Sequence, residues 1–164
     1  MPTLAVSAVG LDRPGIIAGV AERLAAHGAN VTDSRMAILR GHFAMTLIVE
    51  GAERDRLAAD LEQLDALESV SVTEVAEAAA NPRSQPTHVV SVHGADHPGI
   101  LAAVTHVLAE AGANVTDLQT RLAGELYVMI IDVAVPPGAD LPLDEVARDQ
   151  DVKITIRSVE PDVL

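Results

Sequence analysis

The sequence predicts an α+β fold made of two copies of one βαββαβ unit, each a four-stranded antiparallel sheet with two helices on one face. Three observations support this prediction. A stretch of 24 residues recurs at an offset of 84, strand-like and helix-like patterns alternate along each half, and 49% of the residues are hydrophobic. Because there is one Phe, one Tyr and no Trp, a core of Ala, Val, Ile and Leu is expected, which suits thin layers of sheet and helix.

The recurring stretch is an internal duplication. Gly10–Asp33 reads GLDRPGIIAGVAERLAAHGANVTD and Gly94–Asp117 reads GADHPGILAAVTHVLAEAGANVTD, with 15 of 24 positions identical. Chance similarity between two helical segments would not give the same residues in the motifs at both ends. We expect domain 1 at residues 1–80, a small, polar, Pro-containing linker at 81–86 and domain 2 at 87–164. Domains of this size are close to the lower limit for independent folding, so we also expect a homodimer.

The first strand and helix of the unit follow from local patterns. Thr3–Val9 alternates and is rich in β-formers, which predicts a strand. Asp12 is a good N-cap and Pro14 suits the first helical turn, so the helix is expected to start there. Gly28 is expected to end it, as a C-terminal glycine commonly does. The apolar residues at helical spacing are Ile16, Ile17, Val20 and Leu24.

The remainder of the first unit completes the βαββαβ order. Asn30–Leu39 and His42–Glu50 are expected to be strands joined by a tight hairpin at Arg40-Gly41. Leucines on one face predict a helix over Arg54–Leu67, and a last strand is expected over Val70–Val75. This order is the ferredoxin-like split βαβ arrangement.

The second repeat gives the same order, with a second helix that the segment Pro136-Pro137-Gly138 is expected to shorten. Its expected elements are the strand His88–Val92, the helix Ile100–Ala111, the strands Asn114–Leu122 and Leu126–Val135, a helix around Leu143–Arg148 and the strand Val152–Val159.

Charge and composition exclude several classes of function. The net charge of −13 disfavours direct binding to nucleic acid or to an anionic membrane, because both need a basic face. The absence of Cys excludes disulfides and zinc–thiolate sites. The start of the chain lacks the basic region and long apolar run of a signal peptide, and no stretch is long enough to span a bilayer, so a cytoplasmic location is expected.

One motif has the chemistry of a ligand site. In each repeat the first strand runs through Asp-x-Pro-Gly-Ile into a helix, and an Asn follows 18 residues after the Asp. The helix N-terminus offers unpaired amides to an anion, and Gly allows close approach to the backbone. We expect the Asn to return near the same edge. A carboxylate on the amides and an ammonium on a side-chain acceptor would then hold a free α-amino acid.

These motifs resemble the ACT-domain signature. Asp12-Arg13-Pro14-Gly15-Ile16 with Gly28-Ala29-Asn30-Val31 is similar to one copy, and Asp96-His97-Pro98-Gly99-Ile100 with Gly112-Ala113-Asn114-Val115 to a second. The stretch Asp33–Leu39 followed by Phe43 further resembles the glycine cleavage system transcriptional repressor group, which has two ACT domains and little else. ACT domains generally bind amino acids at interfaces between two copies. The resemblance implies ligand-binding roles for Asp12, Gly15, Ile16 and Asn30, and for Asp96, Gly99, Ile100 and Asn114.

Some positions depart from that pattern. A serine-binding member of the family has Asn at the positions of Asp12 and Asp96, and His at those of Gly10 and Gly94, so serine specificity is unsupported. The motifs also have a structural interpretation, since Asp-x-Pro-Gly is a good helix start and Gly-Ala-Asn a good helix stop. We interpret Arg13 and His97, where the copies differ, as exposed loop residues.

Three non-catalytic functions remain open. The leading hypothesis is a regulatory amino-acid sensor that acts through a protein partner, such as a transcription regulator or an enzyme. A ligand-independent interaction module and an accessory subunit of an amino-acid metabolic enzyme are the alternatives. We expect no enzyme activity, because no nucleophile or phosphate-loop pattern is present, and the six scattered His residues make no metal-ligand cluster. No cofactor is expected.

Overall fold

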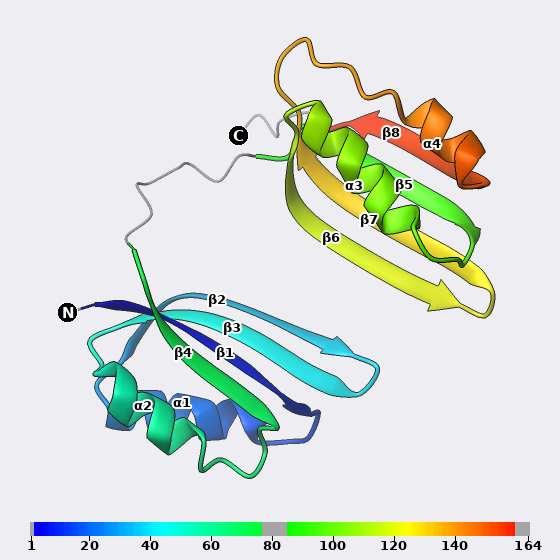
Figure 1. The fold of residues 1–164 in the computed structure, drawn as a ribbon. Helices are drawn as coiled ribbons and strands as arrows, with labels where there is room; N and C mark the ends of the chain where they lie inside the picture. The colour runs from blue at the N-terminus through cyan, green and yellow to red at the C-terminus, as the bar shows by residue number, and fades with distance from the viewer. Residues whose placement is uncertain (1, 77–84, 160–164) are drawn as a thin grey trace. The chain divides into compact units, whose positions relative to one another are not determined.

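A computed structural model describes residues 2–76 and 85–159 of the chain. The chain divides into two compact units, Met1–Ala79 and Ala80–Leu164 (Figure 1). Of the linker expected at 81–86, residues 81–84 lie outside the described residues.

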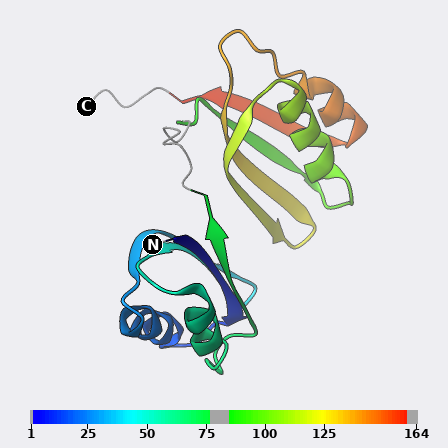
Figure 2. The ribbon, with the colours of Figure 1, turned by 60° about the vertical axis from the view of Figure 1, so that its left-hand side comes forward.

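The first unit has the expected βαββαβ order. Its four strands form one antiparallel sheet in the order β2-β3-β1-β4, and both helices cover the same face of that sheet (Figures 1 and 2). Its elements are β1 (Thr3–Leu11), α1 (Ile16–Ala26), β2 (Asn30–Leu39), β3 (His42–Glu50), α2 (Arg54–Leu61) and β4 (Ser69–Val75).

The second unit repeats the arrangement, with the sheet order β6-β7-β5-β8. The α+β class and the two ferredoxin-like units predicted from the sequence are therefore confirmed. The elements are β5 (His88–Ala95), α3 (Ile100–Glu110), β6 (Asn114–Ala123), β7 (Leu126–Ala134), α4 (Leu143–Asp149) and β8 (Val152–Ser158).

Each core lies between the helices and one face of the sheet. Along β1 every second residue is buried, from Leu4 to Gly10, because alternate side chains of a strand point to opposite faces. Helix α1 buries Ile16, Val20 and Leu24 against them. Strand β2 is exposed along its whole length, so the edge of the sheet that it forms is left uncovered within the unit.

The expected helix Arg54–Leu67 is too long. Helix α2 ends at Leu61, and the chain continues in tight turns in which the N–H of Leu64 donates to the Leu61 carbonyl and that of Leu67 to the Leu64 carbonyl. Leu64 is still buried. The leucine spacing therefore identified residues that face the core but not the backbone that carries them. In the second unit α4 has seven residues against eight in α2, so the expected shortening is only one residue.

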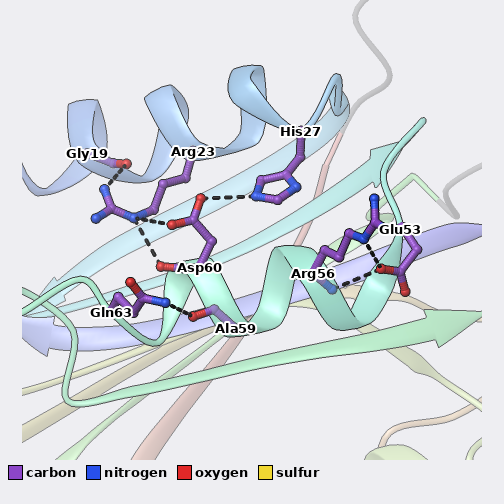
Figure 3. Close-up of polar contacts among 8 residues, drawn as sticks. All are labelled: Gly19, Arg23, His27, Glu53, Arg56, Ala59, Asp60 and Gln63. Atoms are coloured by element: carbon purple, nitrogen blue, oxygen red, sulfur yellow. Dashed lines mark hydrogen bonds and ion pairs between the residues drawn. The ribbon is translucent and has the colours of Figure 1, made fainter.

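Polar contacts join the two helices of the first unit, as Figure 3 shows. Asp60 of α2 lies between Arg23 of α1 and His27, the C-cap of that helix, with Oδ2 3.0 Å from Nε2 of His27 and Oδ1 3.5 Å from Nε of Arg23. The Arg23 Nε also donates to the Asp60 carbonyl at 3.1 Å. Positions 84 residues later are Val107 and Ala111, so the second unit cannot form the same contacts.

Helix α2 has a carboxylate cap at its N-terminus. The backbone N–H groups of Asp55 and Arg56 donate to the Glu53 side chain at 2.9 and 3.1 Å. These two hydrogen bonds favour the ionised form and lower the pKa of Glu53. A negative charge at this end of the helix also interacts favourably with its dipole.

Gly10 lies one residue before the end of β1, where another segment leaves no room for a side chain. A Cβ at Gly10 would collide with the backbone carbonyl oxygen of Ala66, whereas at Gly94 it would lie 2.6 Å from a methyl group of Val152.

Gly10→Ala should lower the free energy of unfolding by roughly 1–3 kcal/mol, the usual range for overpacking, and Gly94→Ala by less. A side chain can move aside more easily than a carbonyl held in the chain. Urea denaturation measures the free energy of unfolding of both variants. An equal loss in the two, or a larger loss in Gly94→Ala, would contradict this prediction.

Candidate functional site

The turn between β1 and α1 is the centre of the candidate site. Helix α1 begins at Ile16, and its N-cap is Gly15 in a left-handed conformation with φ of 89°. Gly99 has φ of 105° before α3 in the second unit. Only glycine adopts these angles without strain. The left-handed geometry that the two turns share therefore comes from the Gly of the Asp-x-Pro-Gly motif.

The expected capping role of Asp12 is wrong. Within the described residues no side chain accepts a hydrogen bond at the start of α1 or of α3. Asp12 is exposed, and its backbone N–H donates to the Gly41 carbonyl at 2.9 Å. Because the helix starts after Gly15 rather than at Pro14, Asp12 is too far back along the chain to cap it. The first-turn amides are left without a side-chain partner.

A pocket of about 450 Å³ opens over this turn. Three of the four residues proposed from the first motif, Asp12, Gly15 and Ile16, lie on its wall. The rest of the wall comes from the turn itself, from the start of α1 and from β2 and β3. The remaining lining residues are Arg13, Pro14, Ile17, Ala18, Met36, Ile38 and Phe43. Met36 and Ile38 of β2, together with Phe43 of β3, carry part of the family resemblance, but the sequence motifs did not place these residues in the site.

Asn30 does not return to the same end of its own unit, contrary to expectation. Asn30 pairs with Glu50, whereas Asp12 follows Leu11, which pairs with His42 at the other end of β3. These ends of the nine-residue strand lie about 26 Å apart at roughly 3.3 Å per residue. In the second unit Asn114 pairs with Ala134, while the end of β5 pairs with Leu126. Asp and Asn of one unit thus cannot hold one small ligand together.

The Gly-Ala part of the second motif is explained by the helix C-terminus. Gly28 has φ of 70°, its N–H donates to the Ala25 carbonyl, and the N–H of Ala29 donates to the Leu24 carbonyl. This pair of hydrogen bonds is a Schellman motif. Gly112 and Ala113 repeat it after α3. Gly28 therefore ends the helix as predicted.

The Val-Thr-Asp segments explain a further part of the repeat, which sequence reasoning did not foresee. In each unit the pairing register shifts at Thr32 or Thr116, which is a β-bulge. The two hydroxyls donate to the carbonyls of Ile48 and Asp132 at 3.2 and 3.1 Å. The strict repetition of Asn-Val-Thr-Asp thus reflects a bulge as well as any ligand role of the Asn.

His97 is not the exposed loop residue that the sequence suggested. It is half-buried, with Nε2 2.7 Å from the Gln150 carbonyl oxygen and Nδ1 3.1 Å from that of Pro98. These hydrogen bonds, with the nearby charges of Asp96 and Asp151, raise the pKa of His97 although partial burial opposes them. Its counterpart Arg13 is exposed and lies on the wall of the pocket.

Across 2–76 and 85–159 there is no group of three or more His, Asp or Glu side chains arranged to hold a metal ion. Among the helices described, none is long and apolar enough to cross a membrane.

Family comparison agrees with the geometry of both units. One ACT domain model matches residues 2–72, and another matches residues 88–150. The chain belongs to the ACT domain family. Both units are therefore regulatory domains of the ACT type, as the motifs predicted.

Several known proteins resemble this tandem ACT protein over different lengths. The glycine cleavage system transcriptional repressor of Escherichia coli is 28% identical over 137 residues, which is 77% of this chain and 72% of that protein. A crystal structure of a protein of unknown function from Galdieria sulphuraria has a TM-score of 0.72 at 32% identity, covering 97% of this chain and 99% of the other. The two proteins therefore share the tandem fold over nearly the whole length of both chains.

Two further relatives match in part. A UPF0237 protein of Methanopyrus kandleri is 44% identical over 55 residues, 34% of this chain, and the match spans 61% of that protein. A phosphoserine phosphatase of Streptomyces coelicolor is 31% identical over 150 residues, which is 87% of this chain but 36% of the enzyme. The tandem ACT arrangement thus resembles part of a larger enzyme as well as most of a transcriptional repressor.

Proposed function

We propose that this tandem ACT protein is a non-catalytic regulator that senses an amino acid and acts through a protein partner. The observation that carries the proposal is the turn of each first motif: an uncapped helix start behind a left-handed glycine, with an exposed carboxylate beside it. In the first unit this turn opens into a pocket. The membership of the ACT family supports a small-molecule ligand, because ACT domains generally bind amino acids.

The two charged groups of an amino acid fit two features of the turn. Its carboxylate would accept hydrogen bonds from the first-turn amides after Gly15, where the helix dipole also favours an anion. Its ammonium would lie against the carboxylate of Asp12. The same roles fall to Gly99 and Asp96 in the second unit, and Ile16 and Ile100 begin the two helices.

Asn30 and Asn114 would contribute from another copy of the domain. Within one unit each lies at the far end of the sheet from the turn, so neither reaches the ligand of its own repeat. The strands that they begin, β2 and β6, lie at the edges of their sheets, and an open edge favours association. A homodimer would place the Asn of one copy near the turn of another.

Action on transcription would follow from a protein contact rather than from binding DNA. The relative in Escherichia coli is a transcriptional repressor by name, and the net charge of −13 gives no basic face for phosphates. The partial likeness to a phosphatase favours a second candidate function, an accessory regulatory subunit of an amino-acid metabolic enzyme.

Removing either carboxylate should weaken ligand binding without unfolding the protein. Asp12→Ala and Asp96→Ala should each weaken affinity at one site by about ten- to a hundredfold, the loss of one hydrogen bond to a charged group. The melting temperature should change little, because both side chains are exposed and cap no helix. Calorimetric titration with the standard amino acids, beside melting curves, measures both. Heat from none of them in the wild type would sink the sensor proposal.

The homodimer and the role of the Asn residues can be tested together. Sedimentation of the full chain at micromolar concentration should give a dimer. Asn30→Ala and Asn114→Ala should weaken ligand binding in that dimer by about tenfold or more while leaving folding intact, since both are exposed. A monomer in sedimentation would contradict the site shared between copies. A lowered melting temperature with unchanged affinity would mean that the Asn side chains only support the helix ends.

The purified protein should not bind DNA by itself. A gel shift with the purified chain at physiological salt should show no retarded band, because eleven Lys and Arg stand against 24 Asp and Glu. In a matched gel shift, the chain is added to DNA that already carries a bound regulator, and a further retardation of that band is measured. A specific band with the chain alone would overturn the proposal that it acts through a protein.

A further inference from the structure

His97 holds the turn of the second unit against the end of helix α4. The residue belongs to the Asp96–Gly99 turn, and its Nε2 lies 2.7 Å from the backbone oxygen of Gln150, which is the C-cap of α4. Its Nδ1 lies 3.1 Å from the backbone oxygen of Pro98. The ring therefore bridges two segments that are 53 residues apart in the chain.

Both partners of the ring can only accept hydrogen bonds. A neutral imidazole carries one N–H, so it can donate to one carbonyl and must turn a lone pair toward the other. The imidazolium carries two N–H groups and satisfies both carbonyls. The geometry thus matches the charged form of His97, whereas the neutral form loses one of the two hydrogen bonds.

The surroundings of the ring also favour a positive charge. The Gln150 carbonyl lies at the C-terminal end of α4, where the helix dipole attracts a cation. The charged groups near the ring are the carboxylates of Asp96, from the same turn, and Asp151, from the turn between α4 and β8. Both attract the imidazolium, and burial alone opposes it.

Among the described residues of the first unit there is no such bridge. Arg13 stands at the equivalent position, where it is exposed and lies beside the open pocket. In the second unit, by contrast, the turn packs on the end of α4: a Cβ at Gly99 would lie 3.6 Å from Oε1 of Gln150. The two candidate turns therefore differ in what holds them, although their motifs match.

We propose that the His97 imidazolium is a pH-dependent clasp that fixes the turn of the second ACT repeat on the end of α4, and that loss of its proton loosens this turn alone. His97 is a positioning residue in this role. The direction in pH follows from the raised pKa of His97. The stabilisation is fully present below the pKa of the unfolded chain and is lost as the pH rises through the folded value.

Amide hydrogen exchange on the full chain, with no ligand added, tests the clasp between about pH 5 and 8, the range in which His changes charge. After correction for the intrinsic pH dependence of exchange, protection in the turn at 96–99 and at Gln150 and Asp151 should fall as pH rises. The fall should reach up to tenfold for each unit by which folding raises the pKa. The turn at 12–15 should show no such change.

Two variants separate the clasp from a merely structural role. His97→Arg keeps a permanent charge and His97→Gln is always neutral, so protection of the turn should be independent of pH in both. His93→Gln removes an exposed histidine of the same unit and should keep the wild-type pH dependence. Wild-type protection that does not change with pH, or pH dependence that survives in His97→Gln, would overturn the clasp. The experiment uses no amino acid, so its failure leaves the proposed sensor function intact.

Discussion

The backbone conformation of one glycine in each unit determines how sheet, helix and candidate site are joined. The chain leaves the central strand and must turn onto the helix layer within a few residues, which Gly15 and Gly99 achieve at φ of 89° and 105°. A residue with a Cβ would have to strain to adopt these angles. The same turn starts the helix without a side-chain cap, so the geometry that builds the fold also leaves amides for an anion.

Most of the fold was predictable because the same βαββαβ pattern occurs twice in the sequence. The fixed offset of 84 aligned each strand and helix with its counterpart, so a weak pattern in one copy was supported by the other. Boundaries shifted where local turns took over from regular structure, as they do after Leu61, where apolar spacing persists without a helix. Periodicity reports which side chains face the core, and backbone hydrogen bonds decide how far the helix runs.

The candidate site was predictable only in part, because its lining depends on positions across the sheet. The turn residues Asp12, Gly15 and Ile16 were found from a contiguous motif, and they line one pocket. Asn30 was misplaced because the spacing of residues does not show at which end of the sheet the chain returns after a helix. Helix α1 carries the chain to the other end of the sheet before β2 begins. His97 was misjudged for a related reason, since its partner Gln150 is distant in sequence.

The two repeats share their turns but differ in the contacts around them. The first unit joins its helices through Arg23, His27 and Asp60, where the second has Val107 and Ala111. The second unit fixes its turn through His97, where the first has Arg13. Duplication followed by such divergence leaves two similar turns that are held by different contacts.

Binding at the turns is most directly tested by mapping where an amino acid protects the backbone. Amide hydrogen exchange of the full chain, with and without the amino acid that most raises its melting temperature, locates the contact. Protection concentrated in the first turns of α1 and α3, at residues 15–18 and 99–102, is the expected result, because the ligand carboxylate would occupy those amides. Protection confined to other segments, with these two turns unchanged, would contradict a ligand site at the glycine turns.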